Sequence, residues 1–333
     1  MKGHGATLVS VVLLCGAALI GSCTKPYHEE NERYVFVATN TSLPYWQTAE
    51  AGFLDAAKVL GVKAELTGPQ GYQPHAELQT FRQVLEQNPT GICLSAGKPE
   101  IFQAEIDKAV AMGIPVICVD ADVPGSKRAL YIGTDNVKAG QESLKRMAAL
   151  LSNKGSIAVL TIQGQHNLDD RVAGVAEALK NFPAVKLTTI LDDKGDARTA
   201  FDEVSELIQK KEKKVDGIIC LEATGGSGAA DALHRLNMEG KLPIVAFDDD
   251  PETLEWIERG AIAATIAQKP YVMSYYGLKY LDDLHHNAVH QFKDWRTAIA
   301  SPLPVFVDTG TVVVEKNNLQ LYREGLPSHA KPM

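Results

Sequence analysis

The sequence predicts an α/β fold built from two doubly wound parallel sheets. Short apolar segments, continuous rather than alternating, recur along the chain with amphipathic segments between them. Continuous β-branched runs are typical of strands covered on both faces, as in a parallel sheet. The 333 residues suffice for about two domains of roughly 150 residues each, and a content of 45% hydrophobic and 22% charged residues is typical of globular proteins.

The expected elements alternate between strand and helix from residue 34 onward. The strands are expected at residues 34–39, 62–66, 91–95, 116–120, 131–134, 156–161, 186–191, 217–221, 244–248 and 263–267. The helices are expected at residues 45–60, 75–87, 101–112, 137–151, 170–181, 197–211, 228–237 and 251–259. A further helix at 272–286 and two strands near 305–307 and 312–314 follow. An alternation of this length predicts doubly wound sheets.

The alternation itself is repeated. One unit covers residues 34–136 and a second covers 156–268, which predicts two similar Rossmann-like lobes. Ligands of open α/β sheets bind beyond the carboxyl ends of the strands. Two lobes that face each other would therefore share one binding cleft.

Several function classes are excluded by composition and motif. The net charge of −8 argues against nucleic acid as a partner. No nucleophile elbow, zinc motif or dinucleotide fingerprint occurs, and the Gly-rich segment 223–228 has no P-loop spacing, so we expect neither an enzyme nor a cofactor. Cys93, Cys118 and Cys220 lie in apolar strand patterns as small hydrophobes. His285, His286 and His290 are interpreted as a solvated helix face, and no metal site is expected.

The N-terminus has the pattern of an export signal. Residues 8–20 form an apolar run that is too short for a membrane span and suits a signal peptide. The run ends in Ile20-Gly21-Ser22-Cys23, which resembles a lipobox. We therefore expect a lipoprotein signal peptide at residues 1–22, a lipid anchor on Cys23 and a tether at 23–32, with a plain secretory signal as the alternative. The expected location is the periplasm or cell envelope.

Three segments carry a family resemblance. Leu43-Pro44-Tyr45-Trp46 follows the first strand, Phe247-Asp248 ends another, and Gln268-Lys269-Pro270 follows the last strand of the second unit. Together they resemble the ribose-binding-protein family of periplasmic sugar receptors, with the type I binding-protein fold. The resemblance implies two lobes joined by a three-segment hinge. It divides the chain into an N-terminal lobe of residues 33–136 plus 270–302 and a C-terminal lobe of 137–269 plus 303–333.

The resemblance also implies a set of ligand-binding residues. They are Tyr45, Trp46, Asp120, Asp122, Asn167, Asp169, Glu222, Asp248 and Gln268. Aromatic faces stack on the apolar faces of sugar rings, while carboxylates and amides bind hydroxyl groups. The structural alternatives are core packing for the two rings, and helix capping or turn formation for the acidic and amide side chains.

Several residues differ from those of the ribose receptors, and these differences affect which ligand is expected. Ala121 and Asp169 stand where the ribose receptors carry arginines, and Gly195 stands where an aromatic ring is frequent. Carboxylates clustered without a nearby cation should have raised pKa values. The first hypothesis is a neutral sugar or polyol, and an amino sugar or a furanosyl autoinducer is the alternative.

The resemblance implies an extracytoplasmic solute receptor that delivers its ligand to the permease of an ABC importer. A ligand-sensing subunit for a chemoreceptor or histidine kinase is the rival interpretation. A transcription repressor with the same core is excluded by the export signal.

Overall fold

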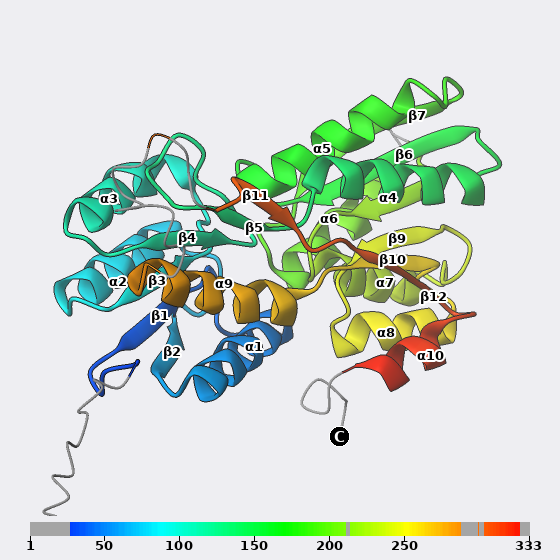
Figure 1. Ribbon diagram of the computed structural model, residues 1–333. Coiled ribbons are helices and arrows are strands. Elements are labelled where there is room, and N and C mark those ends of the chain that lie inside the picture. The colour runs from blue at the N-terminus through cyan, green and yellow to red at the C-terminus, as the bar shows by residue number, and fades with distance from the viewer. Residues whose placement is uncertain (1–26, 211–213, 288–298, 300–302, 327–333) are drawn as a thin grey trace, which may run out of the picture.

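The computed structural model describes residues 27–210, 214–287, 299 and 303–326 of the chain, which form two lobes side by side (Figure 1). Each lobe is built on a six-stranded sheet. The predicted signal peptide, residues 23–26 of the tether with Cys23, and His290 lie outside the described residues. Within the described part, no helix is both long and apolar enough to span a membrane.

The first lobe has an entirely parallel sheet, in the order β11-β5-β4-β3-β1-β2. Its strands are β1 (Arg33–Val37), β2 (Lys63–Thr67), β3 (Gly91–Leu94), β4 (Val116–Val119), β5 (Tyr131–Gly133) and β11 (Phe306–Asp308). Helices α1 (Pro44–Leu60) and α9 (Pro270–His285) share one hydrophobic cluster on this sheet. Helices α2 (Pro74–Glu86) and α3 (Pro99–Ala111) share the other.

The second lobe repeats this plan with strand order β12-β10-β9-β8-β6-β7. Its strands are β6 (Gly155–Thr161), β7 (Val185–Asp192), β8 (Gly217–Cys220), β9 (Ile244–Phe247), β10 (Ala264–Ala267) and β12 (Val312–Glu315), of which only β12 pairs antiparallel among the described strands. Helices α4 (Asn136–Leu150) and α5 (His166–Leu179) pack in one cluster. The other cluster holds α6 (Ala197–Lys210), α7 (Gly225–Arg235), α8 (Pro251–Arg259) and α10 (Leu319–Gly325).

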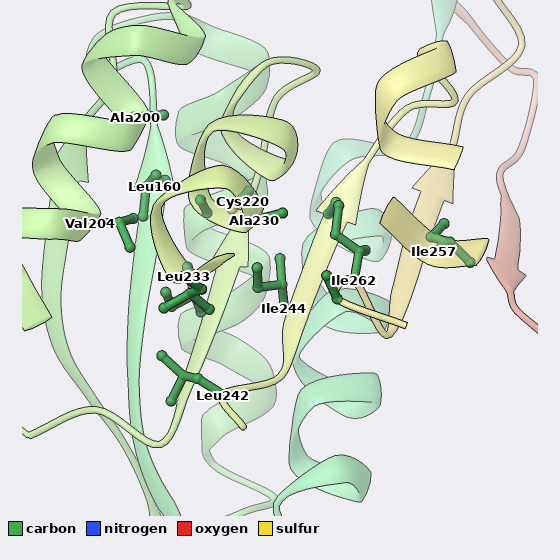
Figure 2. Close-up of a cluster of buried hydrophobic side chains, with 14 of the residues drawn as sticks. Leu160, Ala200, Val204, Cys220, Ala230, Leu233, Leu242, Ile244, Ile257 and Ile262 are labelled. Carbon is green, nitrogen blue, oxygen red and sulfur yellow. The ribbon is translucent and has the colours of Figure 1, made fainter. Parts of the chain in front are cut away.

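Both sheets are covered on both faces, which is the physical reason for the continuous apolar strand sequences. Figure 2 shows Leu160, Cys220 and Ile244 of the second sheet packed against Val204 of α6 and Leu233 of α7. Residues of β3, β4, β8, β9 and β10 are buried throughout. The predicted fold class is thereby confirmed, and the three described cysteines are buried and unpaired as expected.

Three connections join the lobes, namely β5 to α4, β10 to α9 and β11 to β12. The last differs from the expected boundary. Residues from 303 onward were assigned to the second lobe, but Phe306–Asp308 pairs in parallel with β5 of the first sheet. The stacked rings of Tyr131 and Phe306 accompany this pairing. The third crossing therefore lies between Asp308 and Val312, and a three-residue edge strand was too short for its sheet to be assigned from sequence.

Helices α4 and α5 approach each other closely through two glycines. A Cβ atom at Gly140 would lie 2.0 Å from the carbonyl oxygen of Arg171, and one at Gly174 would lie 2.1 Å from that of Val137. No larger residue fits without moving a backbone. The contact fixes the start of α5 relative to α4, the helix that follows the first hinge crossing.

Candidate functional site

A cavity of about 520 Å³, including solvent at its mouth, lies between the two lobes. From the first lobe it is lined by Thr39, Asn40, Leu43, Tyr45, Trp46, Tyr72 and Asp120. From the second lobe it is lined by Ile162, Gln165, Asn167, Leu168, Arg171, Gly195, Glu222, Ala223, Asp248 and Gln268. Most of these residues follow the carboxyl end of a strand or begin a helix, which is the expected place for a ligand.

Seven of the nine expected site residues line this cavity, and two do not. Asp122 lies outside because it forms a two-pronged ion pair with Arg128, in which Nη2 donates to Oδ2 at 2.7 Å. Asp169 is exposed on the first turn of α5 and accepts a hydrogen bond from the Gly164 amide. The same turn directs Asn167 and Arg171 into the cavity. We therefore remove Asp122 and Asp169 from the candidate site.

Two aspartates occupy equivalent positions in the two lobes. Asp120 directly follows β4 and Asp248 directly follows β9, with left-handed φ angles of 68° and 62°. Each donates its backbone amide to the neighbouring strand, and each carbonyl accepts a side-chain hydroxyl, from Tyr131 and Thr265 respectively. A left-handed conformation is uncommon outside glycine and is associated with functional sites. In this protein, the left-handed conformation of Asp120 and Asp248 places a carboxyl group beside the cavity at the ends of β4 and β9.

Two aromatic side chains of the cavity wall, Tyr45 and Trp46, are held by packing and by a hydrogen bond. Pro44 begins α1, and the first-turn residues Tyr45 and Trp46 are only 6% and 4% exposed. The Tyr45 hydroxyl donates to Asp120 Oδ1 at 2.6 Å. The Trp46 ring meets Phe36 edge to face, with ring centroids 5.9 Å apart. The rings thus serve the core and also form one wall of the cavity.

Arg171 places a buried cation in the site, which the sequence interpretation missed. Its Nε donates to Asn136 Oδ1 at 2.9 Å, its Nη1 donates to the Leu221 carbonyl at 2.7 Å, and its guanidinium lies 4.3 Å from the centre of the Phe247 ring. The expectation of carboxylates without a cation is therefore wrong. The Arg-x-x-Gly spacing of Arg171 and Gly174 is visible in the sequence, but this spacing does not show where the Arg171 side chain points.

Burial, more than mutual repulsion, shifts the acidic groups of the cavity. Removal from water raises the pKa of Asp248 to about 7, although Arg171 and the Gln268 amide partly offset the rise. The pKa of Asp120 is raised for the same reason and is partly offset by Tyr45 and Arg171. At neutral pH, Asp248 is thus close to its titration midpoint.

Glu222 has a structural task besides lining the cavity. Its carboxylate accepts hydrogen bonds from the backbone amides of Thr224 and Gly225 and from the Thr224 hydroxyl, and so holds the first residues of α7. Burial, followed by the charge of Glu222, raises the pKa of the adjacent Asp193 to about 9. Burial thus favours a proton on this pair of neighbouring carboxyl groups.

Gln268 connects the two lobes. Its Oε1 accepts from the Thr134 hydroxyl at 2.7 Å, and its Nε2 donates to Asp248 Oδ1 at 2.9 Å. Thr134 follows β5 in the first lobe, whereas Asp248 follows β9 in the second. One amide side chain therefore joins a hinge segment to a cavity carboxylate.

Several polar residues of the cavity were missed because nothing in their local pattern distinguishes them. Asn40 uses Oδ1 to accept from the Ser42 amide and hydroxyl and from the Gly71 amide. Gln165 is new to the site, and its buried Oε1 receives no hydrogen bond from the residues that the structure describes. The same holds for Oδ1 of Asn167. A buried acceptor without a donor costs roughly 1–3 kcal/mol. Both atoms are therefore suited to a ligand that carries hydroxyl donors.

Residues 34–287 match a sequence profile described as "Periplasmic binding protein domain". The chain belongs to this family. The D-allose-binding periplasmic protein of Escherichia coli is 26% identical over 260 residues, which cover 75% of this chain and 83% of that protein. The match confirms the resemblance seen in the sequence.

Comparison with solved structures supports the same family assignment. A sugar-binding protein of a sugar ABC transporter from Bacillus halodurans has a TM-score of 0.78 at 33% identity, covering 87% of this chain and all of that one. AraP, an arabinose-binding protein from Geobacillus stearothermophilus, has a TM-score of 0.73 at 34% identity, covering 88% and 99%. Members of the family are solute receptors without catalytic activity, so the protein is a binding protein and not an enzyme.

The buried position of Arg171 generates a stability prediction. Substitution Arg171→Met keeps the stem but removes the cation, so Asn136 and Leu221 lose their donor and two buried carboxyls lose their counter-charge. Loss of one partner from such an arrangement costs about 3–5 kcal/mol. Urea unfolding measures the change. The exposed Arg198→Gln, which loses a surface ion pair with Asp202 and a cation–π contact with Phe201, serves as control and should change the unfolding free energy by about 1 kcal/mol or less. Equal stability of the two variants would contradict the role assigned to Arg171.

Proposed function

We propose that this protein captures a neutral monosaccharide or polyol in the cavity between its lobes and delivers it to an ABC importer. The receptor class follows from the family and its sugar-binding members, whose names include allose and arabinose. The observation that carries the ligand proposal is the composition of the cavity wall. Aromatic rings form one side, and oxygen acceptors from Asn167, Gln165 and two aspartates surround the remainder.

The polar groups suit hydroxyl donors. Carboxylates accept strong hydrogen bonds from neutral hydroxyls, and the buried oxygens of Gln165 and Asn167 have no donor among the described residues. The Trp46 and Tyr45 rings offer an apolar surface for the C–H face of a sugar ring. This division into one apolar wall and several converging polar groups is typical of small-molecule sites.

The charge balance favours a neutral ligand over an amino sugar. Arg171 already neutralises part of the acidic charge, and the raised pKa of Asp248 reduces it further. A cationic ligand would find a cation in place. An anionic ligand would meet Asp120, Asp248 and Glu222, so a sugar phosphate is disfavoured as well.

Lobe closure would link binding to delivery. Three chain crossings join the lobes, and both faces of the cleft contribute side chains. Hinge closure around a ligand is the established motion of such architectures. In this proposal, the closed surface is the form that the permease recognises.

A ligand panel tests the proposal. Aldopentoses, aldohexoses and polyols should raise the melting temperature, because a ligand at a hundredfold excess over its Kd stabilises by about 2.7 kcal/mol. Asp248→Asn should weaken binding roughly tenfold or more, because a charged acceptor is lost. Asp169→Asn is the matched control and should bind like the original protein. A response to amino sugars alone would replace the neutral ligand with a cation, and no response to any sugar would reject the sugar proposal.

Asp248 predicts a specific pH dependence. Its pKa rises from an ordinary value of 3.8 to about 7 in the folded protein, so its carboxylate is lost as the pH falls below about 7. Sugar affinity should therefore drop by about five- to tenfold between pH 8 and pH 5.5, because a neutral acceptor binds hydroxyls more weakly. Isothermal titration calorimetry measures this change, and Asp248→Asn should flatten the profile.

The empty protein should respond to pH in the opposite direction. The folded state binds the Asp248 proton more tightly than the unfolded state, so this group adds stability as the pH falls from about 7 to about 4. The charged and titratable groups that act on it are Arg171, Asp249 and Asp120, and the neutral Gln268 amide acts through a hydrogen bond. An identical pH profile in Asp248→Asn would assign the effect to one of the other groups.

We further propose that the protein is held at the membrane by a lipid on Cys23. The support is the apolar run at residues 8–20 and the small residues before Cys23. Cys23→Ser removes the acceptor thiol, so the protein should move from the membrane fraction to the soluble fraction or remain unprocessed. Immunoblots after phase separation in detergent measure this, with Cys93→Ser as control. Membrane association that persists in Cys23→Ser would contradict the anchor.

A further inference from the structure

A cluster of metal-binding side chains lies in the first lobe, away from the cleft. His28 and Glu32 precede β1, whereas Asp282 and His286 lie at the end of α9. One ligand atom from each residue lies within 4.8 Å of all the others. Segments more than 250 residues apart in sequence are thus brought together.

The spacing of the ligand atoms suits one small cation. His28 Nε2 lies 3.0 Å from Asp282 Oδ1, His286 Nε2 lies 3.2 Å from Glu32 Oε2, and His286 Nε2 lies 3.5 Å from Asp282 Oδ1. Zinc bonds of about 2.0–2.1 Å in a tetrahedron place neighbouring ligand atoms about 3.4 Å apart. The three distances bracket this value, so small side-chain movements would complete a tetrahedron.

The four side chains are held in place by their neighbours. The Tyr27 ring stacks on His286 with centroids 4.4 Å apart and meets His28 edge to face at 4.7 Å. The Tyr34 hydroxyl donates to Asp282 Oδ1 at 3.1 Å. The Glu29 amide donates to Glu32 Oε1 at 2.7 Å, which leaves Oε2 directed at His286. Such outer contacts orient ligands and sharpen a metal site.

Burial strengthens the case for a cation. The side chains of Glu32 and Asp282 are each only 4% exposed, and those of His28 and His286 are 18% and 14% exposed. The expectation of a solvated face is thus wrong for His286. Two buried carboxylates need a positive partner. A divalent cation bound by the four side chains would supply it.

We propose that His28, Glu32, Asp282 and His286 form a structural zinc site. Two imidazole nitrogens and two carboxylate oxygens suit zinc and related first-row ions, whereas calcium and magnesium prefer oxygen ligands alone. With four protein ligands the site is closed, as structural zinc sites are.

The position of the proposed zinc site indicates what a bound metal would do. Helix α9 has 16 residues and so separates the cluster from Gln268 at the cleft by about 24 Å along its axis. The metal would clamp the segment that precedes β1 onto α9. The folded lobe would then begin at a fixed point immediately after the N-terminal segment, and ligand exchange at the cleft would leave this point unchanged.

Metal titration of the full chain tests the proposal. Protein stripped with EDTA and dialysed at pH 7.5 is titrated with Zn²⁺ by calorimetry, and bound metal is counted by elemental analysis. We expect one tightly bound Zn²⁺ per chain and a rise in melting temperature that EDTA reverses. His286→Gln and His28→Gln should each bind Zn²⁺ at least about tenfold more weakly. The exposed neighbour variant His285→Gln is the matched control and should keep the site.

A second readout separates a metal site from a structural effect of the substitutions. Co²⁺ in a tetrahedral site of nitrogen and oxygen ligands gives visible absorption, which should appear in the original protein and in His285→Gln but not in His28→Gln. Circular dichroism verifies that each variant is folded, and the more exposed His28 keeps the test valid if His286→Gln fails to fold. The proposal is overturned if the original protein binds no Zn²⁺, or if His28→Gln binds it as tightly as the original.

Discussion

The site depends on one buried cation between two buried carboxyl groups. Arg171 lies over the Phe247 ring and donates to Asn136 and Leu221, which leaves its charge to act on Asp120 and Asp248. Its position follows from the close approach of α4 and α5 at Gly140 and Gly174. Burial raises the pKa of both aspartates, and Arg171 opposes this rise together with Tyr45 at Asp120 and Gln268 at Asp248, so these partners favour the charged acceptors that a ligand can use.

The Gln268 side chain is one link between the hinge and the cavity. Gln268 accepts from Thr134 in one lobe and donates to Asp248 in the other, so a ligand that draws on the Asp248 carboxylate competes for the same oxygen. This gives a physical route from occupancy to lobe geometry. It also explains why an amide, which both donates and accepts, suits the position after the last strand of the second unit.

In the first lobe, the ligand cavity and the histidine and carboxylate cluster lie at opposite ends of the strands and helices. The carboxyl ends of its strands face the cavity, whereas the histidine and carboxylate cluster lies before β1 and at the far end of α9. The end near the N-terminal segment is held by side-chain contacts with α9, through Tyr27 and Tyr34. The anchor proposed on Cys23 would attach the protein at this end and leave the opposite end free to close.

The sequence by itself determined the fold class and the repeat of two lobes, because buried parallel strands have continuous apolar patterns. Its resemblance to the ribose-binding-protein family supplied seven of the residues that line the cavity. Only the tertiary structure decided the direction of side chains and long-range pairing. It withdrew Asp122 into an ion pair with Arg128, turned Asp169 to solvent, brought in Arg171 and assigned Phe306–Asp308 to the first sheet. These outcomes depend on the direction of side chains within one loop or helical turn, or on contacts between distant segments, and neither leaves a clear pattern in the chain.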